Sequence, residues 1–188
     1  MYDRDALAKL LRNNALEFGD FTLASGKQAS YYLDCRRVTL DARGARLIGE
    51  GMINLIGELR LKMGQGPKLV GGMAVGADPI TAAILTTAGI KGYPLRGVIV
   101  RKEPKAHGKG QQVEGPFSPG ESIVIVEDVV TTGASSLKAI ELCEAEGLKV
   151  ERVLAIVDRL EGGRAAFAAK GYELTTLFTV EDLGVQLD

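Results

Sequence analysis

The chain is poor in the residues that build metal centres and disulfide frameworks, because its 188 residues include two cysteines and one histidine. Cys35 and Cys143 stand in no C-x-x-C or metal-ligand spacing, which argues against a disulfide scaffold and against a zinc site. The formal net charge is −1 at pH 7, so the composition gives no support to a nucleic-acid-binding protein. Apolar runs are interrupted by glycine or by charge well before the roughly 20 residues that cross a bilayer.

The remaining composition is that of an ordinary globular protein, with 46% hydrophobic and 25% charged residues. A length of 188 residues suits one domain with a substantial core. The first eleven residues, M-Y-D-R-D-A-L-A-K-L-L, are charged and lack the pattern of a signal peptide. We therefore expect a single domain over residues 1–188, located in the cytoplasm and not bound to a membrane.

Apolar stretches typical of strands alternate with stretches of helical spacing after about residue 40. This alternation predicts an α/β fold, with a parallel sheet covered by helices on both faces. The first 40 or so residues fall outside the alternation, and we expect them to form a hood or lid. The strands are expected at 69–73, 95–100, 123–127, 153–157 and 174–178, and the helices at 3–13, 42–59, 79–87, 134–146 and 163–169.

The segment Ile123–Ser136, I-V-I-V-E-D-V-V-T-T-G-A-S-S, is the most informative in the chain. A buried strand is expected to end at the carboxylates of Glu127 and Asp128, and a loop then opens a helix. Such a loop offers unpaired backbone N–H groups, and the helix dipole favours an anion there. Carboxylates suit sugar hydroxyls or a metal, so the segment indicates a sugar phosphate. A solvated strand end followed by an ordinary capped helix is the alternative. Hydroxyl donors are available from Thr131, Thr132, Ser135 and Ser136.

The run E-D-V-V-T-T-G-A-S resembles the phosphoribosyl pyrophosphate (PRPP) motif of type I phosphoribosyltransferases. The resemblance implies the type I phosphoribosyltransferase fold, acids near the ribose hydroxyls and a loop around the 5-phosphate. It also implies Mg²⁺ as cofactor, held mainly through PRPP and not by a cage of protein ligands. The PRPP-binding residues implied are Glu127, Asp128, Val129, Val130, Thr131, Thr132, Gly133, Ala134 and Ser135.

A cationic segment, R-K-E-P-K-A-H-G-K-G-Q-Q, spans 101–112 directly after an apolar stretch. Such a run is often only a solvated charge cluster. The pattern R-K-x-x-K-x-H-G, however, resembles the catalytic loop of orotate phosphoribosyltransferases, where it meets a pyrophosphate leaving group. In that family the loop reaches the active site of the partner subunit, which implies a homodimer that shares loop 101–112 across its interface. The catalytic and PRPP-binding residues implied are Arg101, Lys102, Lys105 and His107.

Two further segments resemble the parts of that family that meet the base. F-T-L-A-S-G-K, over 21–27, resembles the start of the hood, although the family's lysine before Ser-Gly is Ala24 here and Lys27 follows instead. The pair Asp158-Arg159 ends another expected strand, and an arginine there suits the carboxylate of orotate. The orotate-binding residues implied are Thr131, Arg159 and Lys27. An edge hairpin with an exposed lysine, and a local pair of Arg159 with Asp158 or Glu161, are the structural alternatives.

The stretch 69–79, L-V-G-G-M-A-V-G-A-D-P, reads as a strand that enters a glycine-rich turn. In the superfamily this turn faces pyrophosphate, but no lysine lies between Lys68 and Lys91, so a purely structural turn is the alternative. Together the resemblances imply transfer of the 5-phosphoribosyl group of PRPP to N1 of orotate, which gives orotidine 5′-phosphate and pyrophosphate in the de novo synthesis of UMP. A purine phosphoribosyltransferase and a non-catalytic PRPP sensor that binds nucleic acid are the remaining alternatives.

Overall fold

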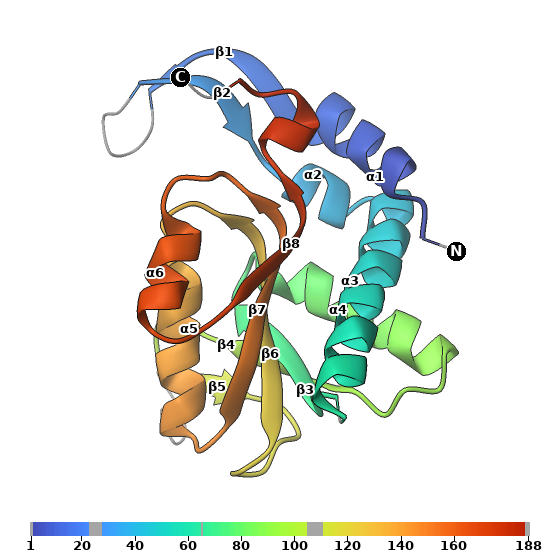
Figure 1. The fold of residues 1–188 in the computed structure, drawn as a ribbon, viewed down its shortest axis with the longest axis vertical. Helices are drawn as coiled ribbons and strands as arrows, with labels where there is room; N and C mark the ends of the chain where they lie inside the picture. Colours follow the sequence, from blue (N-terminus) through green and yellow to red (C-terminus); the bar gives the residue numbers. More distant parts are fainter. Residues whose placement is uncertain (1, 23–27, 65, 105–110, 187–188) are drawn as a thin grey trace.

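The computed structural model describes residues 2–22, 28–64, 66–104 and 111–186. A six-stranded sheet with the order β5-β4-β3-β6-β7-β8 forms its centre (Figure 1). All neighbouring pairs are parallel except β4 and β5, which are antiparallel. The expectation of a mainly parallel sheet is therefore confirmed. The strands are β3 Leu69–Met73, β4 Arg96–Val100, β5 Val113–Glu114, β6 Ser122–Val130, β7 Lys149–Asp158 and β8 Leu174–Thr179.

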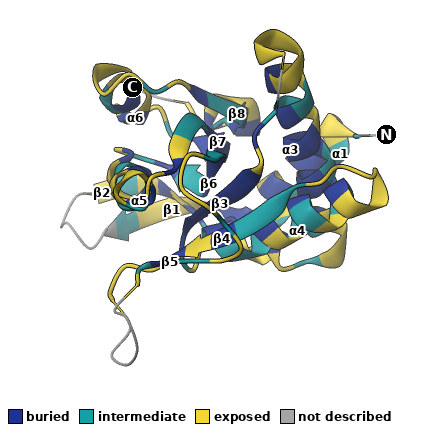
Figure 2. Ribbon diagram, turned by 90° about the horizontal axis from the view of Figure 1, so that it is seen from below, coloured by how far each residue is buried: buried dark blue, intermediate teal, exposed yellow. Residues whose placement is uncertain are grey.

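Helices cover both faces of the sheet, as the continuous apolar strands predicted. Helices α3 (Ala42–Met63) and α4 (Ala77–Ile90) lie on one side, and α5 (Ala134–Ala145) and α6 (Gly163–Ala169) lie on the other. Successive residues of β6 point to opposite faces, so Val124 belongs to one hydrophobic cluster and Ile125 to the other. Buried residues accordingly follow the sheet and the inward sides of the helices, while the outer sides are exposed (Figure 2).

A separate antiparallel hairpin and three short helices precede this sheet. Strands β1 (Leu16–Thr22) and β2 (Gln28–Leu33) pair with each other and with no strand of the large sheet. The hairpin lies at the end of the molecule where β6 and β7 finish (Figure 1). The described residues of 1–40 therefore do stand outside the β/α alternation. The helices are α1 Arg4–Leu10, the π-helical turn η1 Leu11–Ala15 and α2 Arg36–Thr39.

Several element boundaries differ from those expected. Strand β6 continues to Val130, so Glu127 and Asp128 lie inside the strand near its carboxyl end and not after it. Helix α3 runs to Met63, where Gly64 adopts a left-handed conformation with φ of 74° and ends it. The edge strand β5, helix α2 and the short 3-10 helix η2 (Glu181–Leu183) were not expected, because elements this short carry no readable periodicity. Within the described ranges, no helix combines the length and the apolar character needed to cross a membrane.

Candidate active site

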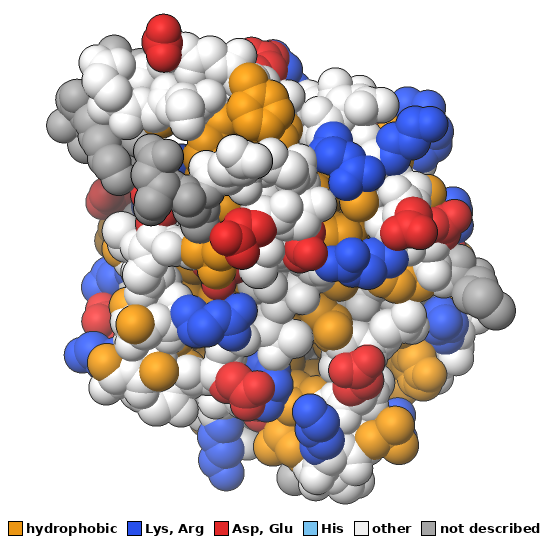
Figure 3. Space-filling view, turned by 45° about the horizontal axis from the view of Figure 1, so that its top comes forward, with side chains coloured by type: hydrophobic (Ala, Val, Ile, Leu, Met, Phe, Trp, Pro, Cys, Tyr) orange, Lys and Arg blue, Asp and Glu red, His pale blue; other side chains and the backbone are white. Residues whose placement is uncertain are grey.

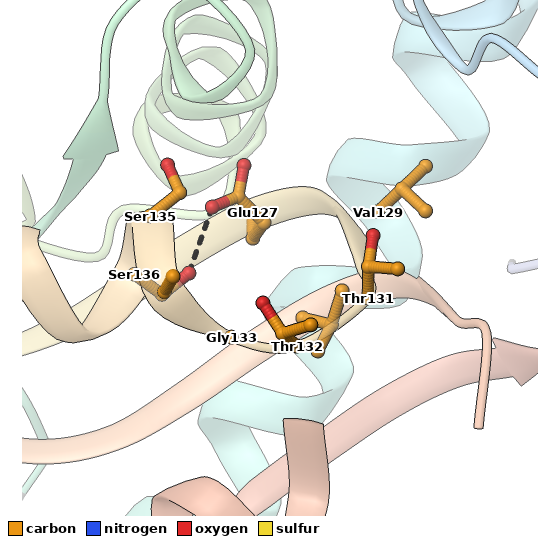
Figure 4. A pocket seen from close by; sticks show the side chains of 9 residues that line it. Glu127, Val129, Thr131, Thr132, Gly133, Ser135 and Ser136 are labelled. Carbon is orange, nitrogen blue, oxygen red and sulfur yellow. Dashed lines mark hydrogen bonds between the residues drawn. The ribbon is translucent and has the colours of Figure 1, made fainter. Parts of the chain in front are cut away.

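A pocket of about 110 Å³ lies where β6 ends and α5 begins (Figure 4). Its lining consists of Glu127 and the residues from Val129 to Ser136. Gly133 shapes it, because its φ of 82° is a left-handed conformation that a side chain rarely tolerates. A Cβ at Gly133 would also lie 3.0 Å from Cζ of Phe167 in α6. The loop is thus held tightly at the first turn of a 12-residue helix, where backbone N–H groups are unpaired.

The segment that follows β7 forms two backbone hydrogen bonds with this loop. The Arg159 N–H donates to Val130 O at 2.9 Å, and the Gly163 N–H donates to Thr131 O at 3.0 Å. A Cβ at Gly163 would lie only 2.8 Å from Thr131 O and 2.4 Å from Cγ1 of Val130. Close approach of α6 to the loop therefore requires glycine at this position.

Glu127 is buried beside the pocket and is held by Ser136. The Ser136 Oγ donates to Glu127 Oε2 at 2.8 Å, and the two residues are 1% and 7% exposed. Burial raises the pKa of Glu127 to about 7, and the negative charge of Asp128 adds to the rise, while the hydrogen bond from Ser136 opposes it. The Ser136 hydroxyl, which the sequence offered as a phosphate donor, is therefore occupied by Glu127.

Asp128 is half-buried and points toward the turn between β3 and α4. Its Oδ1 accepts a hydrogen bond from the Val129 N–H at 2.9 Å. A Cβ at Gly76 would lie 3.0 Å from the same oxygen, so this turn packs closely against the carboxylate. Cys35, at the end of the hairpin, is also near: burial, and then the negative charge of Asp128, raises the pKa of its thiol.

The cationic segment leaves the same edge of the sheet from β4. Arg101 forms an ion pair with Glu114, and its N–H donates to Gln112 O at 2.8 Å. The Gln112 side chain donates to the carbonyl groups of Arg101 and Lys102, at 3.1 and 3.0 Å. These contacts join the two ends of the segment in a hairpin neck. Of the cations predicted from the sequence, Lys105 and His107 lie outside the described residues, as does Lys27.

Arg159 follows β7, and its side chain is only 12% exposed. Its Nε donates to the Tyr31 hydroxyl at 2.9 Å, and its guanidinium carbon lies 4.7 Å from the centre of the Tyr31 ring. Its Nη2 lies 2.9 Å from Oε1 of Glu161, so the local ion pair that the sequence left open is formed. Asp158 pairs instead with Arg164, at 3.3 Å.

The contact between Arg159 and Tyr31 is absent from the sequence predictions. Burial alternates along β2, where Tyr31 and Leu33 are buried and Tyr32 between them is exposed. The inward partner of Tyr31 comes from 128 residues away, and no local pattern identifies it.

The carboxyl ends of the parallel strands bring three of the predicted groups to one edge of the sheet. These groups are the carboxylates near the end of β6 with the pocket loop that follows it, Arg159 after β7, and Arg101 with Lys102 after β4. Figure 3 turns this end of the molecule toward the viewer, and acidic and basic side chains are intermixed across it. The chemical role of each residue stays a prediction at this point.

Comparison with known proteins identifies close relatives. No protein-family model matches the sequence. An orotate phosphoribosyltransferase from Rhodopirellula baltica is 57% identical over 184 residues, which are 98% of this chain and 95% of that relative. The crystal structure of Mycobacterium tuberculosis orotate phosphoribosyltransferase in complex with Fe(III) dicitrate has a TM-score of 0.84 at 37% identity, covering 97% of this chain and 99% of that one. The same enzyme in complex with PRPP gives 0.80 at 33% identity, with 97% and 99% covered.

These relatives decide between the alternatives that the sequence left open. Relatives that are 57% and 42% identical over nearly the whole length of both chains are orotate enzymes, whereas an adenine phosphoribosyltransferase from Leishmania tarentolae shares the fold at 16% identity. The type I phosphoribosyltransferase fold expected from the motif is likewise confirmed. The chain belongs to the orotate phosphoribosyltransferase family.

Proposed function

We propose that the pocket at the end of β6 binds PRPP and is the place where the chain performs the reaction of its family. In that reaction N1 of orotate attacks C1 of PRPP, and pyrophosphate leaves with the bonding electrons and with inversion at C1. The products are orotidine 5′-phosphate and pyrophosphate, in the de novo route to UMP. The observation that carries the proposal is the pocket itself, where hydroxyls and a helix N-terminus lie beside two carboxylates.

The two halves of the pocket suit the two halves of a ribose phosphate. The exposed hydroxyl of Thr132 and the half-buried hydroxyl of Thr131 can meet the 5-phosphate, with the backbone of Gly133 and Ala134. The exposed Ser135 hydroxyl, which also hydrogen-bonds to Glu127, lies between the phosphate side of the pocket and the carboxylate. Asp128 and Glu127 then orient the ribose hydroxyls. Val130 is buried and anchors the loop, while Val129 lines the pocket.

Charge builds on the pyrophosphate as its bond to C1 breaks, and the cations after β4 are proposed to stabilise it. Arg101 and Lys102 are already held at the neck of the segment by Gln112 and Glu114. Lys105 and His107 complete the set proposed from the sequence. Fixed cations aimed at developing charge are among the largest contributions an enzyme makes.

Mg²⁺ is proposed as the cofactor, bound mainly through PRPP. Asp128 and Glu127 offer the oxygen ligands that this ion prefers, and in the described part of the chain no group of three or more histidine, cysteine or acidic residues could hold a metal. A site completed by substrate oxygens fits this donor set. When bound, the ion would neutralise charge on the pyrophosphate.

For the base, Arg159 is proposed to pair with the orotate carboxylate, with Thr131 and Lys27 as further contacts. An arginine matches a carboxylate with two parallel hydrogen bonds. The position of Arg159, directly joined to Val130 of the pocket strand, supports this assignment. Residues 1–40 are proposed to act as a hood over the base within a single domain of residues 1–188.

A homodimer that shares loop 101–112 is also proposed. Val75 and Ile99, which are 73% and 43% exposed, lie beside the start of that loop, where the Ala74 N–H donates to Val100 O at 2.8 Å. Exposed apolar side chains at this place suit a subunit contact. The cytoplasm is the proposed compartment, which is consistent with the two free, buried cysteines.

The direct test follows the absorbance of orotate when the purified protein is mixed with orotate, PRPP and Mg²⁺. A loss of absorbance that requires PRPP is expected, with pyrophosphate released in equal amount. The control replaces orotate with adenine, hypoxanthine or xanthine, none of which should be consumed. Consumption of a purine in place of orotate, or no turnover of any base, would contradict the proposal.

A further inference from the structure

Arg159 is held from two sides before any substrate arrives. We infer that Tyr31 is a positioning residue for the base: its hydroxyl fixes the guanidinium of Arg159 so that one edge stays open to a carboxylate. The inference rests on the proposed function, in which Arg159 meets the carboxylate of orotate. The two residues lie 128 positions apart, so the contact ties the hairpin to the base-binding edge of the sheet.

Tyr31 is built into the fold well enough to serve this purpose. It is 6% exposed and belongs to the main hydrophobic cluster, so its ring has a fixed place. The ring lies 4.7 Å below the guanidinium carbon, a cation–π arrangement, while the hydroxyl accepts from Nε at 2.9 Å. The ring packs against the guanidinium, and the hydroxyl holds its Nε.

The hydrogen bonds leave a specific edge of Arg159 unoccupied. A guanidinium can present two parallel N–H groups along its Nε–Nη2 edge or along its Nη1–Nη2 edge. Tyr31 occupies Nε, and Glu161 takes one hydrogen of Nη2. Nη1 donates to no residue that the structure describes, and Nη2 has a second hydrogen. The Nη1–Nη2 edge is therefore the one that can form a bidentate pair with a carboxylate.

Loss of the Tyr31 hydroxyl should weaken the binding of orotate and leave the binding of PRPP unchanged. Without the Tyr31 hydroxyl the guanidinium can rotate, and Glu161 can draw both Nε and Nη2 toward itself. Orotate would then have to reorder Arg159 on binding, which weakens its affinity. PRPP is proposed to contact other residues, so its KM and kcat at saturation should change little.

The test is Tyr31→Phe, which removes the hydroxyl and keeps the ring. We expect the KM for orotate to rise roughly three- to tenfold, the range for losing one hydrogen bond, with kcat and the KM for PRPP close to wild type. Tyr172→Phe is the matched control, because the Tyr172 hydroxyl donates to Glu144 at 2.6 Å on exposed surface. The control should leave all three constants unchanged. An unchanged orotate KM in Tyr31→Phe would overturn the inference.

A double-mutant cycle separates positioning of Arg159 from a general effect on the fold. Arg159→Lys alone should raise the KM for orotate, because lysine cannot pair bidentately. Adding Tyr31→Phe to Arg159→Lys should then have little further effect, since the hydroxyl acts through the guanidinium. Full additivity would overturn the inference while leaving Arg159 in its role. A normal orotate KM in Arg159→Lys would remove the role of Arg159 and the inference with it, whereas a wild-type protein that consumes no orotate would contradict the proposed function itself.

Discussion

The Ser136 hydroxyl donates a 2.8 Å hydrogen bond to Oε2 of Glu127, and both side chains are buried beside the pocket (Figure 4). Burial raises the pKa of Glu127 from 4.5 to about 7, and Ser136 opposes part of that rise. The carboxyl group therefore changes its charge close to neutral pH. Both the stability of the fold and the behaviour of the pocket should depend on pH through this pair.

The first prediction concerns stability. A raised pKa means that the folded chain holds the Glu127 proton more tightly than the unfolded chain, so its contribution to stability is complete below pH 4.5 and is lost as the pH rises toward 7. The loss can reach about 3 kcal/mol. Glu127→Gln cannot ionise and should gain stability over wild type as the pH rises through this window. Urea unfolding of both proteins across the window measures the difference.

Glu181→Gln serves as the control for that measurement, since Glu181 is exposed in η2 and lies away from the pocket. Its unfolding free energy should follow that of wild type over the same pH range. A constant difference between Glu127→Gln and wild type would mean that burial does not shift the titration of Glu127.

The second prediction concerns the activity profile. If ionised Glu127 orients the ribose, kcat/KM for PRPP should fall as the pH drops through its pKa. Ser136→Ala removes the hydrogen bond that lowers the pKa, so the acid limb of the profile should move to higher pH. Ser135→Ala is the comparison: the Ser135 hydroxyl also lowers the pKa of Glu127, but less than the Ser136 hydroxyl does, so this change should move the limb less. Because Ser135 is exposed and is proposed to meet the phosphate, the same change should also raise the KM for PRPP. Identical limbs in wild type and Ser136→Ala would contradict this account of the pair.

The main sheet could be predicted from the sequence because its strands are buried on both faces and read as unbroken apolar runs. The expected strand at 69–73 coincides with β3, and the expected helix at 163–169 coincides with α6. The end of β6 was predicted too early, because the apolar run stops at Val126. The backbone pairing with β7 continues to Val130, which lies opposite Asp158. Hydrogen bonding between strands does not follow side-chain polarity.

The candidate site, too, could be predicted from the sequence only in part. The pocket loop was readable as a local motif, because its hydroxyls, glycine and acids are consecutive. The direction of the Ser136 hydroxyl was not readable, since it depends on the burial of a glutamate nine residues earlier. The hydrogen bond from Arg159 to Tyr31 depends on how the hairpin packs over the sheet. The two residues are 128 positions apart, and neither segment alone predicts the contact.

The third prediction is that Gly163→Ala will disturb the pocket loop from outside it. The added Cβ would lie 2.8 Å from Thr131 O, which is tighter than packed atoms allow. Displacing the loop should cost about 1–3 kcal/mol of unfolding free energy and raise the KM for PRPP. Gly57→Ala is the control, because a Cβ there meets no atom within 4 Å in the interior of α3, and it should stabilise by up to about 1 kcal/mol. Wild-type stability and KM in Gly163→Ala would show that the loop can move away without loss.

The last prediction tests the cationic segment as catalytic machinery. Lys105 is proposed to meet charge that develops on the pyrophosphate, so its contribution should be greater in the transition state than in the bound substrate. Lys105→Ala should therefore lower kcat by roughly a hundredfold to a thousandfold, as loss of one such contact does, and raise the KM for PRPP much less. Steady-state kinetics with PRPP varied at saturating orotate measures both constants. Lys91→Ala, at an exposed lysine after α4, controls for the loss of a surface charge and should match wild type. An unchanged kcat in Lys105→Ala would remove the segment from the chemistry and return it to a solvated charge cluster.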